Sequence, residues 1–117
     1  MPDCIFCKII SGQIPADVFY SDDRVLAIKD IQPIAKGHVV VMYKTHHEHT
    51  KDLNPKDQAY LFTKTVELAE QVKAETKAEA YNLLIFDGEA AESAVPHRPH
   101  IHIVPRNKND GIKIDPR

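Results

Sequence analysis

Two histidines separated by one residue, His100 and His102, stand near the C-terminal end of the chain, with Ile101 and Ile103 in the alternate positions. Successive side chains of a β-strand point to opposite faces, so this spacing predicts one imidazole face and one apolar face. Neutral imidazoles act as nucleophiles, general bases or metal ligands near pH 7. We therefore expect a strand that presents both histidines to a chemical site, although a solvated polar face would show the same alternation.

A third histidine, His97, lies on the other side of Pro99 from this pair. Proline has no N–H to donate to a neighbouring strand, so we expect the strand to begin there. Alternation therefore does not tell where the side chain of His97 points.

A pair of cysteines, Cys4 and Cys7, lies near the N-terminus, and the chain has no others. Two thiolates at this spacing can bind one zinc ion, which takes four nitrogen or sulfur ligands, so further ligands must come from elsewhere. The alternative is a redox-active dithiol. Such a motif normally follows a strand inside a βαβ unit, and no strand precedes these cysteines.

Further candidates lie at the ends of the expected strands. Asp30 follows an apolar run and is either a turn former, which its local sequence favours, or a ligand at the edge of a site. His38 begins an apolar strand, as a capping residue or as a fourth imidazole near the site. The segment 46–49 holds three histidines, and we expect one of them to bind metal and the other two to lie on the surface.

The elements that position these residues can be read from periodicity and turn residues. A short helical turn at 5–10 precedes a hairpin of strands 18–20 and 24–31, and a third strand follows at 38–43. Asn54-Pro55 predicts the start of one long helix that ends near Lys77. A fourth strand at 81–86 and the histidine strand complete an α+β domain with a mostly antiparallel sheet. The predicted core stripe of the helix is Ala59, Phe62, Val66, Ala69 and Val72.

Length and composition set limits on function. The 117 residues predict a single domain, residues 1–117, with a net charge of −2. No basic cluster suits a nucleic-acid polymer, no apolar run is long enough to span a membrane, and residues 1–4 do not resemble a signal peptide. We expect a cytoplasmic protein with reduced cysteines.

Several segments together resemble the histidine-triad (HIT) family, in particular its small bacterial members near the Hint branch. The matching segments are Cys4–Ala16, Asp30-Ile31, Lys36–Val39, Lys44–His46 and His100–Arg106. The resemblance implies a five-stranded antiparallel sheet with one long helix and a short N-terminal helix. It also implies a homodimer with one continuous sheet, and hydrolysis or transfer at the α-phosphorus of purine nucleotide conjugates such as phosphoramidates or dinucleoside polyphosphates.

Roles follow from the resemblance residue by residue. His100 matches the nucleophile that forms a nucleotidyl-histidine, while His102 and His38 match the other active-site histidines. Asp30 would accept hydrogen bonds from ribose hydroxyls. The expected walls of the base pocket are Ile5, Phe6, Ile9, Ile28 and Ile31. The resemblance also implies a structural zinc ion held by Cys4, Cys7, His46 and His97.

The chain departs from the family pattern at two places. The family spaces its histidines H-x-H-x-H, whereas one extra residue separates His97 from His100, and we expect a β-bulge at Arg98–Pro99 to absorb it. In the preceding loop, the family usually has Asn-x-Gly followed by Gly-Gln-Ser/Thr-Val, and the Asn, Gln and Ser side chains bind phosphate oxygens or the leaving group. The Asn, Gly, Gln and Ser/Thr positions are occupied here by Phe86, Glu92, Ser93 and Ala94. Of these, Ser93 is expected to replace one lost bond to the nucleotide.

Two functions remain open at this point. The intact His38, His100, His102 and Asp30 favour a nucleotide hydrolase or transferase, weakened or shifted in substrate. The loop substitutions favour a zinc-stabilised nucleotide-binding or scaffold protein without turnover, because lost donors to transition-state charge cost on the order of 100-fold in rate. A redox role would predict that Cys4 and Cys7 bind no metal.

Overall fold

The computed structural model describes residues 4–114; residues 1–3 and the last three residues of the polar tail, 115–117, lie outside the described part. Its elements, in chain order, are α1 (Ile5–Ile10), β1 (Val18–Ser21), β2 (Val25–Lys29), β3 (Val39–Tyr43), η1 (Thr50–Asp52), α2 (Pro55–Thr76), β4 (Ala80–Ile85), η2 (Glu89–Ala91) and β5 (His100–Arg106).

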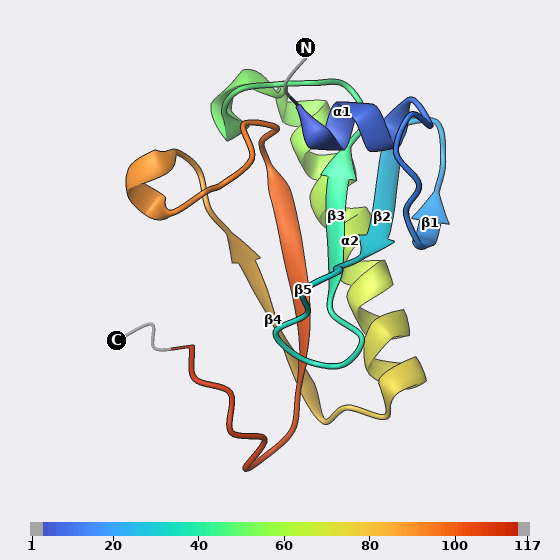
Figure 1. The fold of residues 1–117 in the computed structure, drawn as a ribbon, viewed down its shortest axis with the longest axis vertical. Coiled ribbons are helices and arrows are strands. Elements are labelled where there is room, and N and C mark those ends of the chain that lie inside the picture. Colours follow the sequence, from blue (N-terminus) through green and yellow to red (C-terminus); the bar gives the residue numbers. More distant parts are fainter. Residues whose placement is uncertain (1–3, 115–117) are drawn as a thin grey trace.

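The five strands form one sheet in the order β1-β2-β3-β5-β4, and every neighbouring pair is antiparallel. The long helix α2 lies behind the sheet, and the short helix α1 lies on the opposite face near one end (Figure 1). The predicted α+β fold, with five antiparallel strands, one long helix and a short N-terminal helix, is confirmed. No helix within residues 4–114 is long and apolar enough to span a membrane.

The alternation predicted for the histidine strand is also confirmed. Ile101 and Ile103 belong to the buried cluster that packs against α2. His100 pairs with Met42 and His102 pairs with Val40 across the β3–β5 ladder. Met42 belongs to the second buried cluster, which packs against α1, so both imidazoles lie on the α1 face.

The long helix begins and ends as its sequence predicts, but its buried face differs. Asn54 caps it by accepting the N–H of Asp57 at 2.9 Å, and the left-handed Lys77, with φ of 57°, ends it. The predicted core stripe is wrong at Ala59, which is exposed, and at Phe62, which is 55 % exposed. Ala69 and Val72 are buried as predicted, but nearer the start of α2 the buried face is shifted by one residue, because Leu61 rather than Phe62 packs in the cluster with the sheet residues. The buried face consists of Leu61, Thr65, Leu68, Ala69 and Val72.

The extra residue of the histidine stretch is accommodated without the predicted bulge. Strand β5 begins at His100, and the residues from His97 to Pro99 lie outside the ladder, with a cis peptide bond before Pro99. The backbone N–H of Arg98 donates instead to the carbonyl of His47 at 2.8 Å. This contact with the loop after β3 takes the place that a ladder bond would have in a bulged strand.

Candidate functional site

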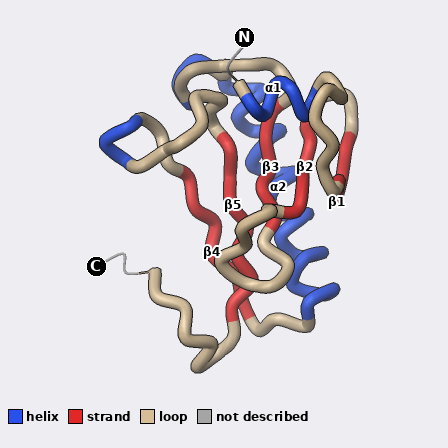
Figure 2. Tube along the Cα trace, viewed as in Figure 1, coloured by secondary structure: helices blue, strands red, loops and turns tan. Residues whose placement is uncertain are grey.

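The loops after β3 and β4 meet near the N-terminal end of α1 (Figure 2). Cys4, Cys7, His46 and His97 converge there, with all four ligand atoms within 4.8 Å of one another. Sγ of Cys7 lies 3.2 Å from Nδ1 of His46, and Sγ of Cys4 lies 3.4 Å from Nδ1 of His97. Cys4 is the N-cap of α1, so the helix start holds the first thiol and places the second one turn later.

The two histidines of this cluster present unprotonated Nδ1 atoms to the thiols. Nε2 of His97 donates to the carbonyl of Tyr43 at 2.6 Å, and Nε2 of His46 donates to Glu48 at 2.7 Å. A neutral imidazole has one proton, so each Nδ1 carries a lone pair. Such outer hydrogen bonds orient the histidine ligands of metal sites.

The donor set of this cluster fits a tetrahedral zinc ion with two sulfur and two nitrogen ligands. Burial and the neighbouring Cys4 raise the pKa of the Cys7 thiol to about 11, so a metal ion has to displace the thiol proton at neutral pH. Both cysteines are free thiols. The prediction that these four residues bind zinc is compatible with this arrangement.

His100 lies directly beside this cluster. Its Nδ1 donates to the backbone carbonyl of His97 at 2.8 Å, and its side chain is 4 % exposed. The ring of Phe6, from α1, packs edge-on against the imidazole with centroids 5.1 Å apart. Burial lowers the pKa of His100 and outweighs the bond to the His97 carbonyl, which acts in the opposite direction. The ring therefore stays neutral with its lone pair on Nε2.

A second group joins Asp30, His38 and His102. Nδ1 of His38 accepts the backbone N–H of Ile34 at 3.1 Å, so its proton is on Nε2, which donates to Nδ1 of His102 at 2.9 Å. His102 therefore carries its own proton on Nε2. Burial, followed by His100 and His38, lowers the pKa of His102 to about 4.

These hydrogen bonds make this group less suited to binding a metal ion than the cysteine cluster. Metal binding at Nε2 of His38 would need the proton on Nδ1, where it would face the N–H of Ile34. The Asp30 carboxylate, 3.6 Å from Nε2 of His38, also accepts the N–H of Gln32 at 2.8 Å. We therefore interpret Asp30, His38 and His102 as a polar, hydrogen-bonded group. In the cysteine cluster, by contrast, the Nδ1 lone pairs of His46 and His97 can bind a metal ion.

A cavity of about 500 Å³ opens beside strand β5, and both His100 and His102 line it. Of the predicted nucleotide-contacting residues, all seven line this cavity: Ile5, Phe6, Ile9, Ile28, Asp30, Ile31 and Ser93. They do so unequally, because Ile28 is buried whereas Ile31, at the mouth, is 93 % exposed. The walls are mainly apolar, as a base-binding pocket requires.

The atypical loop between β4 and β5 forms one side of this cavity through Phe86, Glu92 and Ala94. The ring of Phe86 packs against His102 with centroids 5.8 Å apart. Ser93 is buried, and its hydroxyl oxygen accepts a hydrogen bond from Nε of Arg98 at 3.1 Å. Arg98 was not predicted as a site residue from the sequence. Its position between His97 and His100 could have indicated that it lies near the site.

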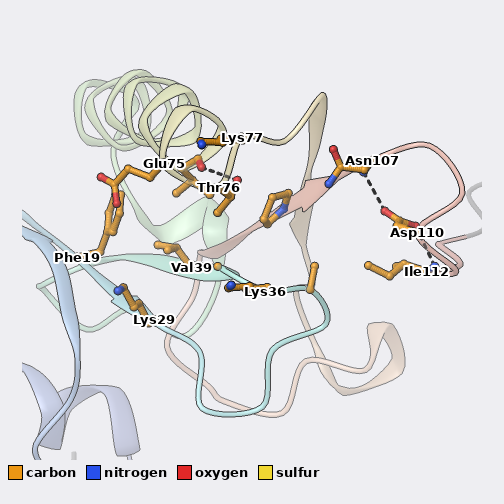
Figure 3. Close-up of a pocket in the computed structure, with 14 residues that line it drawn as sticks. Phe19, Lys29, Lys36, Val39, Glu75, Thr76, Lys77, Asn107, Asp110 and Ile112 are labelled. Carbon is orange, nitrogen blue, oxygen red and sulfur yellow. Dashed lines mark hydrogen bonds between the residues drawn. The ribbon is translucent and has the colours of Figure 1, made fainter.

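A larger cavity of about 740 Å³ lies at the C-terminal end of α2 (Figure 3). Its lining includes Lys29, Lys36 and Lys77 but no histidine or cysteine. Although it is larger, the imidazoles of His100 and His102 line the other cavity. The histidine-lined cavity is therefore the candidate site.

Comparisons with known proteins agree with this arrangement. The HIT domain family model matches residues 11–109. An uncharacterised HIT-like protein of Methanocaldococcus jannaschii is 43 % identical over 108 residues, covering 92 % of this chain and 82 % of the relative. An adenylylsulfatase of Arabidopsis thaliana is 35 % identical over 92 % of this chain, which spans only 54 % of that protein.

Among solved structures, a zinc-bound histidine triad family protein of Mycobacterium smegmatis superposes with a TM-score of 0.90. It is 35 % identical, and the match covers 99 % of this chain and 85 % of that one. The fold, the histidine-lined cavity and the family match lead to one conclusion: the chain belongs to the HIT family.

Proposed function

We propose that the protein is a nucleotidyl hydrolase or transferase that acts at the α-phosphorus of a purine nucleotide conjugate. The observation that supports this most is the hydrogen bond from Nδ1 of His100 to the carbonyl of His97. It leaves the lone pair of His100 on Nε2, on a residue that lines the candidate cavity. A neutral imidazole held in one tautomer is an effective nucleophile near pH 7.

In the proposed reaction, Nε2 of His100 attacks the α-phosphorus. A P–N bond forms while the bond to the leaving group breaks, and the leaving group departs with the electron pair and takes up a proton. Water then attacks the nucleotidyl-histidine, which releases a nucleoside monophosphate and restores the imidazole. The Nε2 proton of His102 would donate to a non-bridging phosphate oxygen, and the hydrogen bond from His38 supports this tautomer of His102.

The rest of the cavity suits a purine nucleoside. The base would lie against the apolar walls formed by Ile5, Phe6, Ile9, Ile28 and Ile31, and Asp30 would accept hydrogen bonds from the ribose. The printed name of the Arabidopsis relative, an adenylylsulfatase, is consistent with chemistry on an adenylyl group. We infer phosphoramidates or dinucleoside polyphosphates as substrate classes, with turnover reduced by the altered β4–β5 loop.

We further infer that Cys4, Cys7, His46 and His97 hold a structural zinc ion, as the zinc-bound relative from Mycobacterium smegmatis supports. When bound, the ion supplies a cross-link between α1, the loop after β3 and the segment before β5. Thiol ligands need a reducing compartment, so we propose a cytoplasmic location. We treat residues 1–117 as a single HIT domain.

A homodimer is the proposed assembly. Strand β4 is an edge strand whose second side has no partner within residues 4–114, and its last residue, Ile85, is 49 % exposed. Phe62 on α2 is also exposed. Pairing of two β4 edges would continue the sheet and protect its unpaired backbone groups. Sedimentation velocity would test this, since a purely monomeric species at micromolar concentration contradicts the proposal.

A nucleotide-binding or scaffold protein without turnover is the second candidate function. Phe86 and Ala94 provide no hydrogen-bonding side chains in the loop, and Glu92 adds negative charge beside the cavity. These residues disfavour a second anionic group near the α-phosphate. The two candidates differ in whether a covalent intermediate forms.

The experiment is intact-protein mass spectrometry after brief mixing with an adenosine phosphoramidate, with AMP release followed by chromatography. We expect a mass increase equal to one adenylyl group in the wild type. His100→Ala should show neither adduct nor product, whereas His47→Ala, a histidine outside both groups, should behave as wild type. Thermal stabilisation by AMP with no adduct and no product would favour the binding role instead.

A further inference from the structure

Arg98 occupies an unusual position for a charged side chain. It is 6 % exposed, and no carboxylate of residues 4–114 lies within ion-pair distance of its guanidinium. Burying a cation without an anionic partner is costly unless it is well hydrogen-bonded. An apolar side chain would fill the same space at lower cost, so the contacts of the guanidinium indicate what it contributes.

Those contacts join three segments around the site. Nη1 donates to the carbonyl of Glu48 at 2.9 Å, and the backbone N–H donates to the carbonyl of His47 at 2.8 Å. Nε donates to the hydroxyl oxygen of Ser93 at 3.1 Å. The first bond anchors the guanidinium to the loop after β3, and the second anchors the Arg98 backbone to the same loop. The third bond therefore comes from a restrained donor and orients the Ser93 hydroxyl.

The hydroxyl of Ser93 accepts from Arg98 and donates only a long hydrogen bond, of 3.5 Å, to the carbonyl of Val95. Because normal O–H···O bonds are about 2.5–3.0 Å long, this proton is available to a closer acceptor. Ser93 lines the cavity together with His100 and His102. Of the loop side chains that line this cavity, it is the one that can donate, because the others are Phe86, Glu92, Ala94 and Val95.

We propose that Arg98 and Ser93 act as a pair in which the buried guanidinium polarises the Ser93 hydroxyl toward a phosphate oxygen of the bound nucleotide. Hydrogen bonds in series strengthen one another, and a cationic donor makes the terminal O–H a stronger donor. Ser93 is then the group that touches substrate, and Arg98 is a positioning residue. This inference rests on the proposed nucleotide chemistry and supplies a donor within the atypical loop.

The test is a double-mutant cycle with Ser93→Ala, Arg98→Met and the combined variant. We expect each single change to lower kcat on adenosine phosphoramidate by on the order of 100-fold with little change in KM. The combined variant should lose no more than Ser93→Ala alone, because both changes remove the same donor. Losses that multiply in the combined variant, or a normal kcat in Ser93→Ala, would overturn the pair.

Conservative variants separate this role from a merely structural one. Ser93→Thr keeps a hydroxyl and should recover most of the kcat, and Arg98→Lys keeps a cation and should recover part of it. Lys51→Met, which removes an exposed cation on the neighbouring loop, is the matched control. Thermal unfolding and zinc content of each variant show whether it is folded, and equal loss of kcat in Thr and Ala variants at position 93 would contradict the proposal.

A binding measurement tests the pair independently of turnover. Calorimetry gives the ratio of the affinities for AMP and for adenosine, and this ratio should fall in Ser93→Ala and Arg98→Met. If the wild type forms no adduct but this ratio falls, the Arg98–Ser93 pair stands and the proposed catalysis fails. If the wild type turns over and neither the ratio nor kcat changes in the variants, the pair fails and the proposed catalysis stands.

Discussion

The backbone carbonyl of His97 accepts a hydrogen bond from Nδ1 of His100 across 2.8 Å, while Nδ1 of the His97 side chain faces the thiols of the cysteine cluster. One residue therefore belongs to the candidate metal site through its side chain and orients the candidate nucleophile through its backbone. Because the cluster restrains His97, it also restrains the tautomer of His100.

The hydrogen bonds of the candidate site predict which ring nitrogen carries the proton in three imidazoles. His100 should carry its proton on Nδ1 because that atom faces a carbonyl acceptor. His38 and His102 should carry theirs on Nε2 because the Nδ1 atom of each ring accepts from an N–H donor. Long-range ¹H–¹⁵N correlation spectra distinguish the two tautomers, and single His→Gln variants assign the signals. A His100 ring with its proton on Nε2 would contradict the proposed nucleophile.

The cysteine cluster predicts a metal-dependent stability. Cys4→Ser should leave the purified protein depleted of zinc and lower its unfolding temperature, since the free energy of metal binding contributes to folding. His47→Gln, in the same loop but outside the cluster, should retain the metal. Elemental analysis and thermal unfolding with and without a chelator provide the measurements. If the wild type purifies without zinc, the zinc interpretation is wrong and the redox alternative is favoured.

The outer hydrogen bond of His46 predicts a smaller effect on metal affinity. Glu48 accepts the Nε2 proton of His46 at 2.7 Å and so favours the lone pair on Nδ1. Glu48→Ala should weaken zinc binding by about 10- to 100-fold while leaving the four ligands in place. Competition with a chromophoric chelator measures this affinity, with Glu67→Ala on the exposed side of α2 as control.

We predict that protonation of His102 lowers the stability of the folded protein in weak acid. Its pKa is about 4 in the folded protein against an ordinary value of 6.5, so the unfolded chain takes up the proton first. Its contribution to stability is therefore complete above pH 6.5 and is lost as the pH falls toward 4, by on the order of 3 kcal/mol.

Urea unfolding at pH 7 and at pH 4.5 measures this effect. The wild type should lose more stability between the two conditions than His102→Gln, because the variant has no imidazole to protonate at that position. Acid release of metal affects both proteins alike, so the difference between them reports on His102. Equal losses would show that His102 does not titrate between folded and unfolded states as expected.

We predict that Asp22, which lies outside the candidate site, contributes to the unfolding free energy. Burial opposes its ionisation, but hydrogen bonds from Tyr60, Tyr20 and the backbone N–H groups of Arg24 and Val25 outweigh it and hold the pKa of Asp22 well below its usual range. Asp22→Asn should therefore cost about 1–3 kcal/mol of unfolding free energy. The exposed neighbour change Asp23→Asn should be close to neutral, and similar unfolding temperatures for the two variants would contradict this role.

Local patterns determined much of the fold. The alternation of histidine and isoleucine from His100 to Ile103 placed both imidazoles on one face, because strand periodicity depends only on neighbouring residues. Asn54-Pro55 marked the start of α2 for the same reason. The face of α2 was harder to predict, since Phe62 and Leu61 are both apolar and only packing against the sheet decides which is buried.

Tertiary structure alone decided the chemistry of the site. Cys4 and His97 are 93 positions apart, so no local pattern in the chain could give their contact. The tautomer of each histidine depends on an acceptor or donor from another segment, such as Ile34 for His38. Arg98 looked like an irregularity in the histidine spacing, and its bond to Ser93 exists only because the β4–β5 loop folds back over it. Sequence supplies residue types and local periods, whereas the protonation state and direction of a buried polar group are set by whichever partner the fold brings to it.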